Sequence, residues 1–127
     1  YHITAYGGQE MSNFIRNTLH TKNMLASAFL VNSAINFKVS HFVFISSCAV
    51  DGSKASAPLL EDAYFTPDDL HGISKFSTEL DVLVANKQFG LNYTIFRAHN
   101  LHGYKAGLVP KNFLKRSSSF FFKPSQL

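Results

Sequence analysis

The 127-residue chain contains no tryptophan and a single cysteine, Cys48. One cysteine excludes an internal disulfide and is typical of proteins from a reducing compartment, so we expect a cytoplasmic protein. No apolar run approaches the roughly 20 residues that span a bilayer, and no segment resembles a signal peptide. Charged residues make up only 16% of the chain, but apolar residues make up 46%, which is too many for a disordered chain. The sequence therefore predicts one globular domain or less, with no membrane segment.

Acidic residues are absent from the C-terminal end of the chain. Residues 104–127 carry five basic and no acidic side chains, whereas residues 1–103 carry seven basic and eight acidic ones. The net charge of +4 is therefore a property of this tail. A basic patch can attract nucleic acid or acidic lipid. The tail has no RNA-binding motif, however, and five scattered charges are typical of a solvated end, so we expect neither a nucleic-acid nor a membrane partner.

The first half of the chain predicts a strand end and a long helix. Residues 2–5 have the character of a strand end, and Gly7 and Gly8 then interrupt the chain. Over about residues 11–37, apolar side chains recur at the three- and four-residue spacing of a helix. The second part of this helix is apolar around much of its circumference. Such a helix is covered on more than one side, so we expect it between a sheet and a partner subunit.

The second half predicts two strands with a helix between them. Residues 41–46 form a short continuous apolar run, which is typical of a buried parallel strand. Residues 52–67 predict a loop, and a helix over about 71–89 ends where Gly90 supplies a C-terminal cap. Residues 91–97 predict the next strand. The fold class is therefore α/β, with a βαβαβ order whose right-handed crossovers give a parallel sheet.

Polar residues follow each of the three predicted strands. They are Thr4 and Ala5 after the first, Ser46, Ser47 and Cys48 after the second, and Arg97, His99 and Asn100 after the third. Ligands of open α/β sheets bind outside the carboxyl ends of the strands, so these residues predict one shared crevice. His99 and His102 lie three residues apart, but no third ligand has suitable spacing, and we expect no metal site.

Five segments resemble motifs of the extended short-chain dehydrogenase/reductase superfamily. Residues 42–52 read Phe-Val-Phe-Ile-Ser-Ser-Cys-Ala-Val-Asp-Gly and resemble Ser-Ser-x-x-Val-Tyr-Gly. Residues 70–75 read Leu-His-Gly-Ile-Ser-Lys and resemble Pro-Tyr-Gly-x-x-Lys, the catalytic Tyr-x-x-x-Lys signature. Residues 97–103 read Arg-Ala-His-Asn-Leu-His-Gly and resemble Arg-Pro-x-Asn-x-Tyr-Gly. Residues 2–5 are similar to a His-Leu-Ala-Ala strand end, and residues 23–27 to the Asn-x-x-Gly-Thr of a long helix. Together they resemble the NAD-dependent epimerase/dehydratase family, of the UDP-glucose 4-epimerase type.

This resemblance implies a Rossmann-like doubly wound parallel sheet that binds NAD and a UDP-sugar. In the family, a phenol removes the proton of a sugar hydroxyl while hydride passes to NAD, and a nearby Lys favours the phenolate. The implied catalytic residues are Ser47, His71 and Lys75. The implied binding residues are Thr4, Ala5, Asn23 and Lys75 for the cofactor, and Asn100 for the substrate. The family's dimer interface further implies a homodimer through the helices at about 11–37 and 71–89.

The residue at the phenol position is His71. Imidazole can accept a proton near neutral pH, but its ring ends about 2 Å short of a phenol oxygen, a displacement that costs roughly 10²-fold in rate. Lys75, one helical turn later, also disfavours the protonated ring. Four other motif positions differ from the family: Asp51 and His102 replace Tyr, and Leu70 and Ala98 replace Pro. These departures predict impaired catalysis.

The resemblance extends to about residue 104. It implies a partial NAD(P)-binding Rossmann-like domain over 1–104 and a basic, atypical tail over 105–127, where residues 117–122 match no expected element. None of the seven glycines forms the family's phosphate-binding glycine loop, and we expect this N-terminal half and the sugar-nucleotide domain to be missing. Three functions stay open: an impaired epimerase fragment, a non-catalytic interaction subunit, and a truncation product without function.

Overall fold

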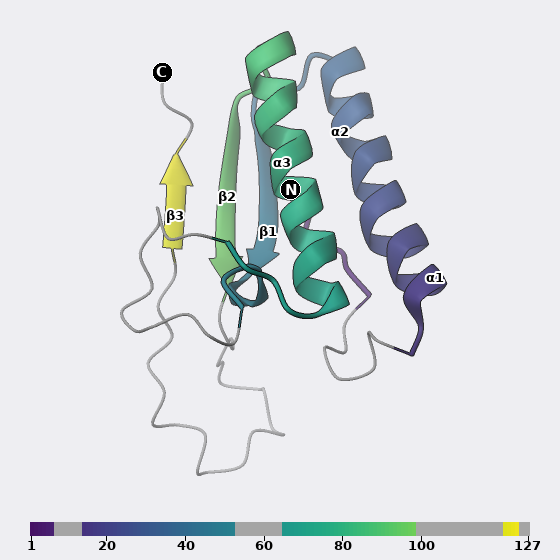
Figure 1. Ribbon diagram of the computed structural model, residues 1–127. Coiled ribbons are helices and arrows are strands. Elements are labelled where there is room, and N and C mark those ends of the chain that lie inside the picture. Colours follow the sequence, from purple (N-terminus) through teal and green to yellow (C-terminus); the bar gives the residue numbers. More distant parts are fainter. Residues whose placement is uncertain (7–13, 53–64, 99–120, 125–127) are drawn as a thin grey trace, which may run out of the picture.

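The computed structural model describes residues 1–6, 14–52, 65–98 and 121–124, and it has the predicted α/β architecture (Figure 1). Strand β1 (Phe42–Ser47) pairs in parallel with β2 (Tyr93–Ala98) from Phe42 opposite Tyr93 to Ser47 opposite Ala98. The predicted first strand is a single parallel bridge between His2 and Phe44. Its two hydrogen bonds run from the His2 N–H to the Val43 carbonyl, 2.7 Å, and from the Ile45 N–H to the His2 carbonyl, 3.1 Å. The predicted parallel order is thus confirmed.

One strand of the sheet was not predicted. The sequence gives no element over 117–122, but β3 (Phe121–Pro124) pairs antiparallel with β2, from Arg97 opposite Phe121 to Thr94 opposite Pro124. The strand order is β1-β2-β3, so β3 forms the outer edge beside β2. The described sheet is therefore mixed.

The long N-terminal helix begins later than predicted. Phe14 and Ile15 precede it, and it runs through α1 (Arg16–Leu19), the π-helix η1 (His20–Leu25) and α2 (Ala26–Asn36). The predicted start at residue 11 is wrong because apolar spacing indicates which face is buried but does not mark the first hydrogen-bonded turn. The π-helix η1 lies between α1 and α2 and was not predicted. Such wide turns are rare in proteins, and those that occur are often found at functional sites.

The second helix has the predicted extent. Helix α3 (Leu70–Phe89) begins after Asp69, whose carboxylate accepts a 2.6 Å hydrogen bond from the Gly72 N–H. This side-chain cap replaces one of the bonds that the first turn of a helix lacks. At the other end Gly90 adopts the left-handed conformation, φ 70°, and its N–H donates to the Asn86 carbonyl. The predicted stop at Gly90 is confirmed.

The core lies between the sheet and the two helices, which stand side by side on one face of it (Figure 1). Its buried residues come from α2, β1, α3, the chain before β2, and β2: Val31, Ala34, Phe42, Phe44, Val82, Ala85, Leu91, Tyr93 and Ile95. A short 3-10 helix, η2 (Cys48–Val50), follows β1 directly and was not predicted. In the described residues, no helix is both long enough and apolar enough to cross a membrane.

Candidate active site

Lys75 lies at the end of β1 that the sequence predicted to carry the site. Its side chain is only 6% exposed, and its Nζ donates a 2.7 Å hydrogen bond to the Ile45 carbonyl. The same ammonium lies 4.9 Å from the ring centroid of Phe44. Burial lowers the pKa of Lys75 from 10.5 to about 8, although the Glu79 carboxylate opposes this shift. The ammonium of Lys75 is therefore held, partly desolvated, against the carbonyl of Ile45, which lies two residues before Ser47 in β1.

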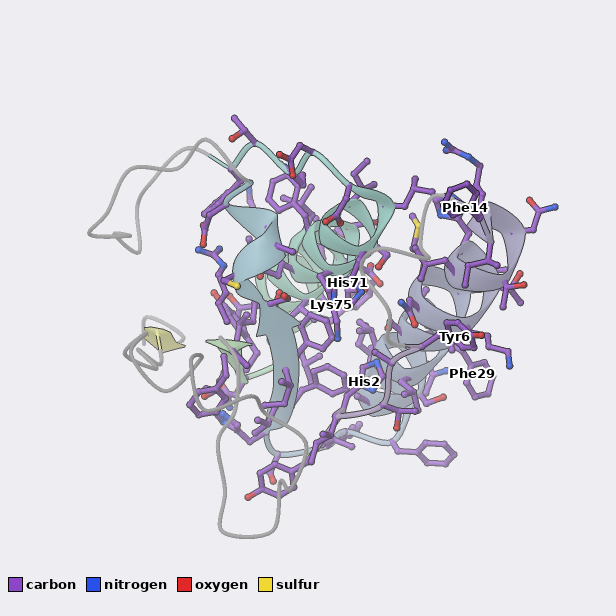
Figure 2. All side chains as sticks on the ribbon, turned by 90° about the horizontal axis from the view of Figure 1, so that it is seen from below. His2, Tyr6, Phe14, Phe29, His71 and Lys75 are labelled. Atoms are coloured by element: carbon purple, nitrogen blue, oxygen red, sulfur yellow. The ribbon has the colours of Figure 1, made fainter. Side chains whose placement is uncertain are left out.

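His71 lies one helical turn before Lys75, and Figure 2 shows the two side chains next to each other. Its Nδ1 is buried and has no hydrogen-bond partner in the described part of the chain. Burial lowers the pKa of His71 below 6.5, and the charge of Lys75 lowers it further, whereas Asp69 acts in the opposite direction. The imidazole is therefore neutral at pH 7.

The two serines at the end of β1 have different environments. The Ser47 hydroxyl accepts a 3.2 Å hydrogen bond from the Ala49 N–H and so caps η2. Ser46 is buried, and its hydroxyl has no hydrogen-bond partner among the described residues. Buried residues alternate along β1, so Ser46 shares the face of Phe44 while Ser47 takes the other. Sequence reasoning gave the hydroxyl role to Ser47 and did not distinguish the buried Ser46.

The side chain of Asn23, on the long helix, contacts both the chain after the first strand and α3. It is buried in η1, where its side-chain oxygen accepts a 2.7 Å hydrogen bond from the Tyr6 N–H and its amide donates to the Tyr6 carbonyl, 3.3 Å. The amide also lies 3.5 Å from the hydroxyl of Ser74, the neighbour of Lys75. Thr4, which is exposed, and Ala5, which is half-buried, directly precede Tyr6. The structure thus brings Thr4, Ala5 and Asn23 to one place.

Asn100 lies outside the described residues, as do His99 and His102. Within the described ranges no group of His, Cys, Asp and Glu side chains could hold a metal ion.

Sequence reasoning assigned no role to His2, which lies near Lys75. Figure 2 shows its side chain between the sheet and the long helix. It is buried, its Nε2 lies 2.7 Å from the Ser27 hydroxyl, and its ring centroid lies 5.4 Å from that of Phe44, with the two rings tilted by 34°. Burial lowers the pKa of His2, and Lys75 lowers it further. The His of the His-Ile-Thr-Ala motif was the one signal that could have drawn attention to this residue.

Arg97 was predicted to follow the third strand and face the shared crevice, but it lies inside β2 and is buried in an ion group. Its guanidinium binds the Glu79 carboxylate through two nitrogens, at 3.0 Å to Oε1 and 2.7 Å to Oε2. Its Nη1 lies 3.8 Å from Oδ1 of Asp51. No motif spacing connects these three positions, so the sequence alone gave no signal for the group.

The arrangement suits a ligand rich in hydroxyl groups. The ammonium of Lys75 has three donors, of which the Ile45 carbonyl takes one. The Ser46 hydroxyl and Nδ1 of His71 are buried polar atoms without partners in the described part of the chain, and such atoms are normally satisfied. The two remaining donors of Lys75 suit the hydroxyl groups of a ribose or sugar ring at the carboxyl end of β1. The residues present therefore fit the nicotinamide ribose and sugar that the motifs imply.

These features define an α/β fold of the Rossmann-like type with its polar site at the ends of parallel strands. The model of the NAD-dependent epimerase/dehydratase family matches residues 1–121, and the chain belongs to this family. A curated relative, UDP-glucose 4-epimerase of Azospirillum brasilense, is 32% identical over 84 residues, which are 66% of this chain and 24% of the relative.

Solved structures give the same result. UDP-glucose 4-epimerase of Thermotoga maritima, solved with UDP-glucose, has a TM-score of 0.75 and 28% identity. That match covers 80% of this chain and 34% of the other. UDP-N-acetylglucosamine 4-epimerase of Methanobrevibacter ruminantium has a TM-score of 0.72 and 26% identity, with 81% and 36% coverage. The chain thus spans about a quarter to a third of the length of these relatives.

Proposed function

We propose that this chain contributes the catalytic-residue portion of an NAD-dependent nucleotide-sugar epimerase of the UDP-glucose 4-epimerase type, active in the cytoplasm. The observation that carries the proposal is the place of Lys75: a buried ammonium at the carboxyl end of β1, beside His71. Charge that is held in a dry site acts strongly on a bound group, because water does not screen it. The relatives that bind UDP-sugars support the choice of substrate.

Each candidate residue has a role in this proposal. Lys75 holds the nicotinamide ribose, Thr4, Ala5 and Asn23 border the cofactor, and Asn100 faces the sugar nucleotide. NAD, when bound, accepts hydride from the sugar ring and returns it. Ser47 hydrogen-bonds the reacting sugar hydroxyl, and a ring nitrogen of His71 takes up its proton.

The same geometry supports a lowered rate. An imidazole that has taken the proton is a cation, and both its burial and the charge of Lys75 disfavour that form. His71 is therefore a poorer base than a phenol at this position. We propose that the site is impaired for this reason.

The test is interconversion of UDP-glucose and UDP-galactose by the full chain with NAD⁺, compared with His71→Tyr and His71→Phe. We expect His71→Tyr to raise the rate by roughly 10²-fold, because the phenol oxygen reaches farther, while His71→Phe loses the remaining activity. Thermal melting with and without NAD⁺ provides the binding measurement, with Lys75→Met as the control that loses the ribose contact. A melt that neither NAD⁺ nor UDP-glucose shifts, in the parent and in His71→Tyr, would contradict the proposal.

A second candidate function is that of a non-catalytic interaction subunit. It is favoured by exposed apolar side chains on both helices: Leu25 and Phe29 on the long helix, and Ile73, Leu80 and Val84 on α3. Isolated exposed apolar residues are ordinary, but a set shared by two adjacent helices is typical of an interface. In this role the chain forms a homodimer, or pairs with an intact family member, through α2 and α3. A truncation product without function, the third possibility, would show no cooperative melt.

A further inference from the structure

Arg97 makes its contacts away from solvent. Its residue is 7% exposed, and its partners Glu79 and Asp51 are 2% and 3% exposed. The fork of the guanidinium holds the Glu79 carboxylate through two nitrogens, a geometry that fixes direction as well as distance. The ring of Phe65 covers its face, with Cζ 4.0 Å from the ring centroid. A buried ion group of this kind is costly to break, because removing one member leaves another charge unpaired.

The two partners of Arg97 belong to the two elements that carry the proposed catalytic residues. Asp51 directly follows η2, the turn that the Ser47 side chain caps. Glu79 lies on α3, one helical turn after Lys75. Arg97 itself lies in β2, opposite Ser46 of β1. One guanidinium therefore connects the turn after Ser47 to the helix that bears Lys75.

The surrounding packing leaves little room for that turn to move. A Cβ at Gly72 would overlap the carbonyl oxygen of Ala49, so the first turn of α3 lies directly against η2. The Thr66 hydroxyl donates a 3.1 Å hydrogen bond to the Asp51 carbonyl. A shift of the Asp51 side chain would therefore be transmitted along η2 toward Ser47.

We propose that Arg97 is a positioning residue that, through Asp51 and Glu79, sets the place of the Ser47 turn relative to Lys75. The proposal rests on the proposed function for the roles of Ser47 and Lys75. The proposal also explains why position 51 carries Asp where the family motif has Tyr. The carboxylate is one half of a buried ion pair that Tyr could not form, so this departure from the motif adds an interaction.

Electrostatics provide a measurement of this coupling. Glu79 raises the pKa of Lys75, and Arg97 neutralises Glu79. Among the described residues, His71 on α3 and His2 on the first strand also interact with the Lys75 charge. Loss of the Arg97 charge would leave Glu79 uncompensated and raise the pKa of Lys75.

The experiment uses the full chain without ligand and has two readouts. Titration of the Lys75 side chain by NMR of ¹⁵N-lysine protein should show its pKa rising by about one unit in Arg97→Met. Arg97→Lys, which keeps the charge, should stay close to the parent, and Arg97→Met with Glu79→Gln should return the pKa to the parent value or below it. This pattern of rescue would show that the charge of Arg97 acts on Lys75 through Glu79.

The second readout is amide hydrogen exchange. Asp51→Asn removes one ion pair and should leave the protein folded. We expect exchange of the Asp51 N–H, bonded to the Cys48 carbonyl, to accelerate at least about 10-fold while the β1–β2 ladder keeps its protection. Unchanged exchange in Asp51→Asn, together with an unchanged Lys75 titration in Arg97→Met, would overturn the proposal. Neither readout involves NAD or a sugar, so this outcome is separate from any failure of the proposed activity.

Discussion

At the residue scale, the site depends on charges held out of water. Lys75 keeps an ammonium at the end of β1 with one carbonyl, one aromatic face and a nearby carboxylate as its compensation. His2 and His71 are both pushed toward their neutral forms by burial and by this ammonium. Burial therefore favours the neutral form of both histidines and the charge of Lys75 adds to this effect, while the burial of Lys75 itself costs folding free energy.

The cost of burying Lys75 should appear in the pH dependence of stability. The unfolded chain binds the Lys75 proton up to about pH 10.5 and the folded chain only up to about 8, so the penalty is fully present below pH 8 and declines as the pH rises to 10.5. We expect the stability of Lys75→Met relative to the parent to fall by up to about 3 kcal/mol over this window. Urea unfolding at pH 7 to 10.5 measures it. Burial raises the pKa of Cys48 and of Tyr93, but both variants contain these groups, and a constant difference would contradict the prediction.

The sequence predicted part of this site. The strand ends and the motif of residues 70–75 located His71 and Lys75 because motif spacing is local. The group of Asp51, Glu79 and Arg97 could not be predicted, because its members lie on three elements whose approach is decided by packing. The unpartnered hydroxyl of Ser46 was also missed, since the sequence does not show which of two adjacent serines faces inward.

At the element scale, the contact between η2 and α3 fixes the entrance to the helix. The Gly72 position carries no side chain because the Ala49 carbonyl occupies that space, and Pro67 lies on the same side. The Asp69 cap and this close approach together determine where α3 begins. Apolar spacing and a C-terminal Gly predicted the extent of this helix, whereas the short 3-10 turn and the π-helix have no such signature.

The close approach at Gly72 gives a prediction with a matched control. Gly72→Ala should destabilise the chain by about 1–3 kcal/mol, because the added methyl group overpacks the η2 contact. Gly90→Ala meets no atom within 4 Å and should cost only about 1 kcal/mol, from its left-handed backbone. Thermal or urea unfolding compares the two. Equal costs would show that the η2 turn yields to the extra methyl group.

At the scale of the whole molecule, one face of the sheet is covered by helices whose outer sides are apolar. The long helix packs against α3 and the core over the sheet, but its outer side is not covered, since Phe29 stays 71% exposed. The homodimer through α2 and α3 is a proposal that would cover it. The division of the chain at residue 104 also stays a prediction. The unpredicted β3 lies beyond residue 104, and the match to the family model also extends past it, to residue 121.

The dimer proposal predicts a loss of association on adding charge to this face. Phe29→Glu or Leu80→Glu should weaken self-association at least about 10-fold, because a carboxylate buried in an apolar interface without a partner is strongly unfavourable. Ile3→Glu, also at an exposed apolar residue but on the first strand, should leave association unchanged. Sedimentation velocity measures all three. A parent chain that remains monomeric at every concentration tested would rule out the homodimer.

The parallel pairing of β1 with β2 also bears on how the chain folds. Parallel neighbours cannot be joined by a tight hairpin, so β1 meets β2 only after the whole of α3 has been arranged between them. Closing such a long loop costs entropy before any pairing compensates for it, and high contact order slows folding. Strand β3 can add only when β2 is already in place, because β2 is its sole neighbour in the described sheet. In the described sheet, β3 therefore depends on β2 for all of its strand pairing.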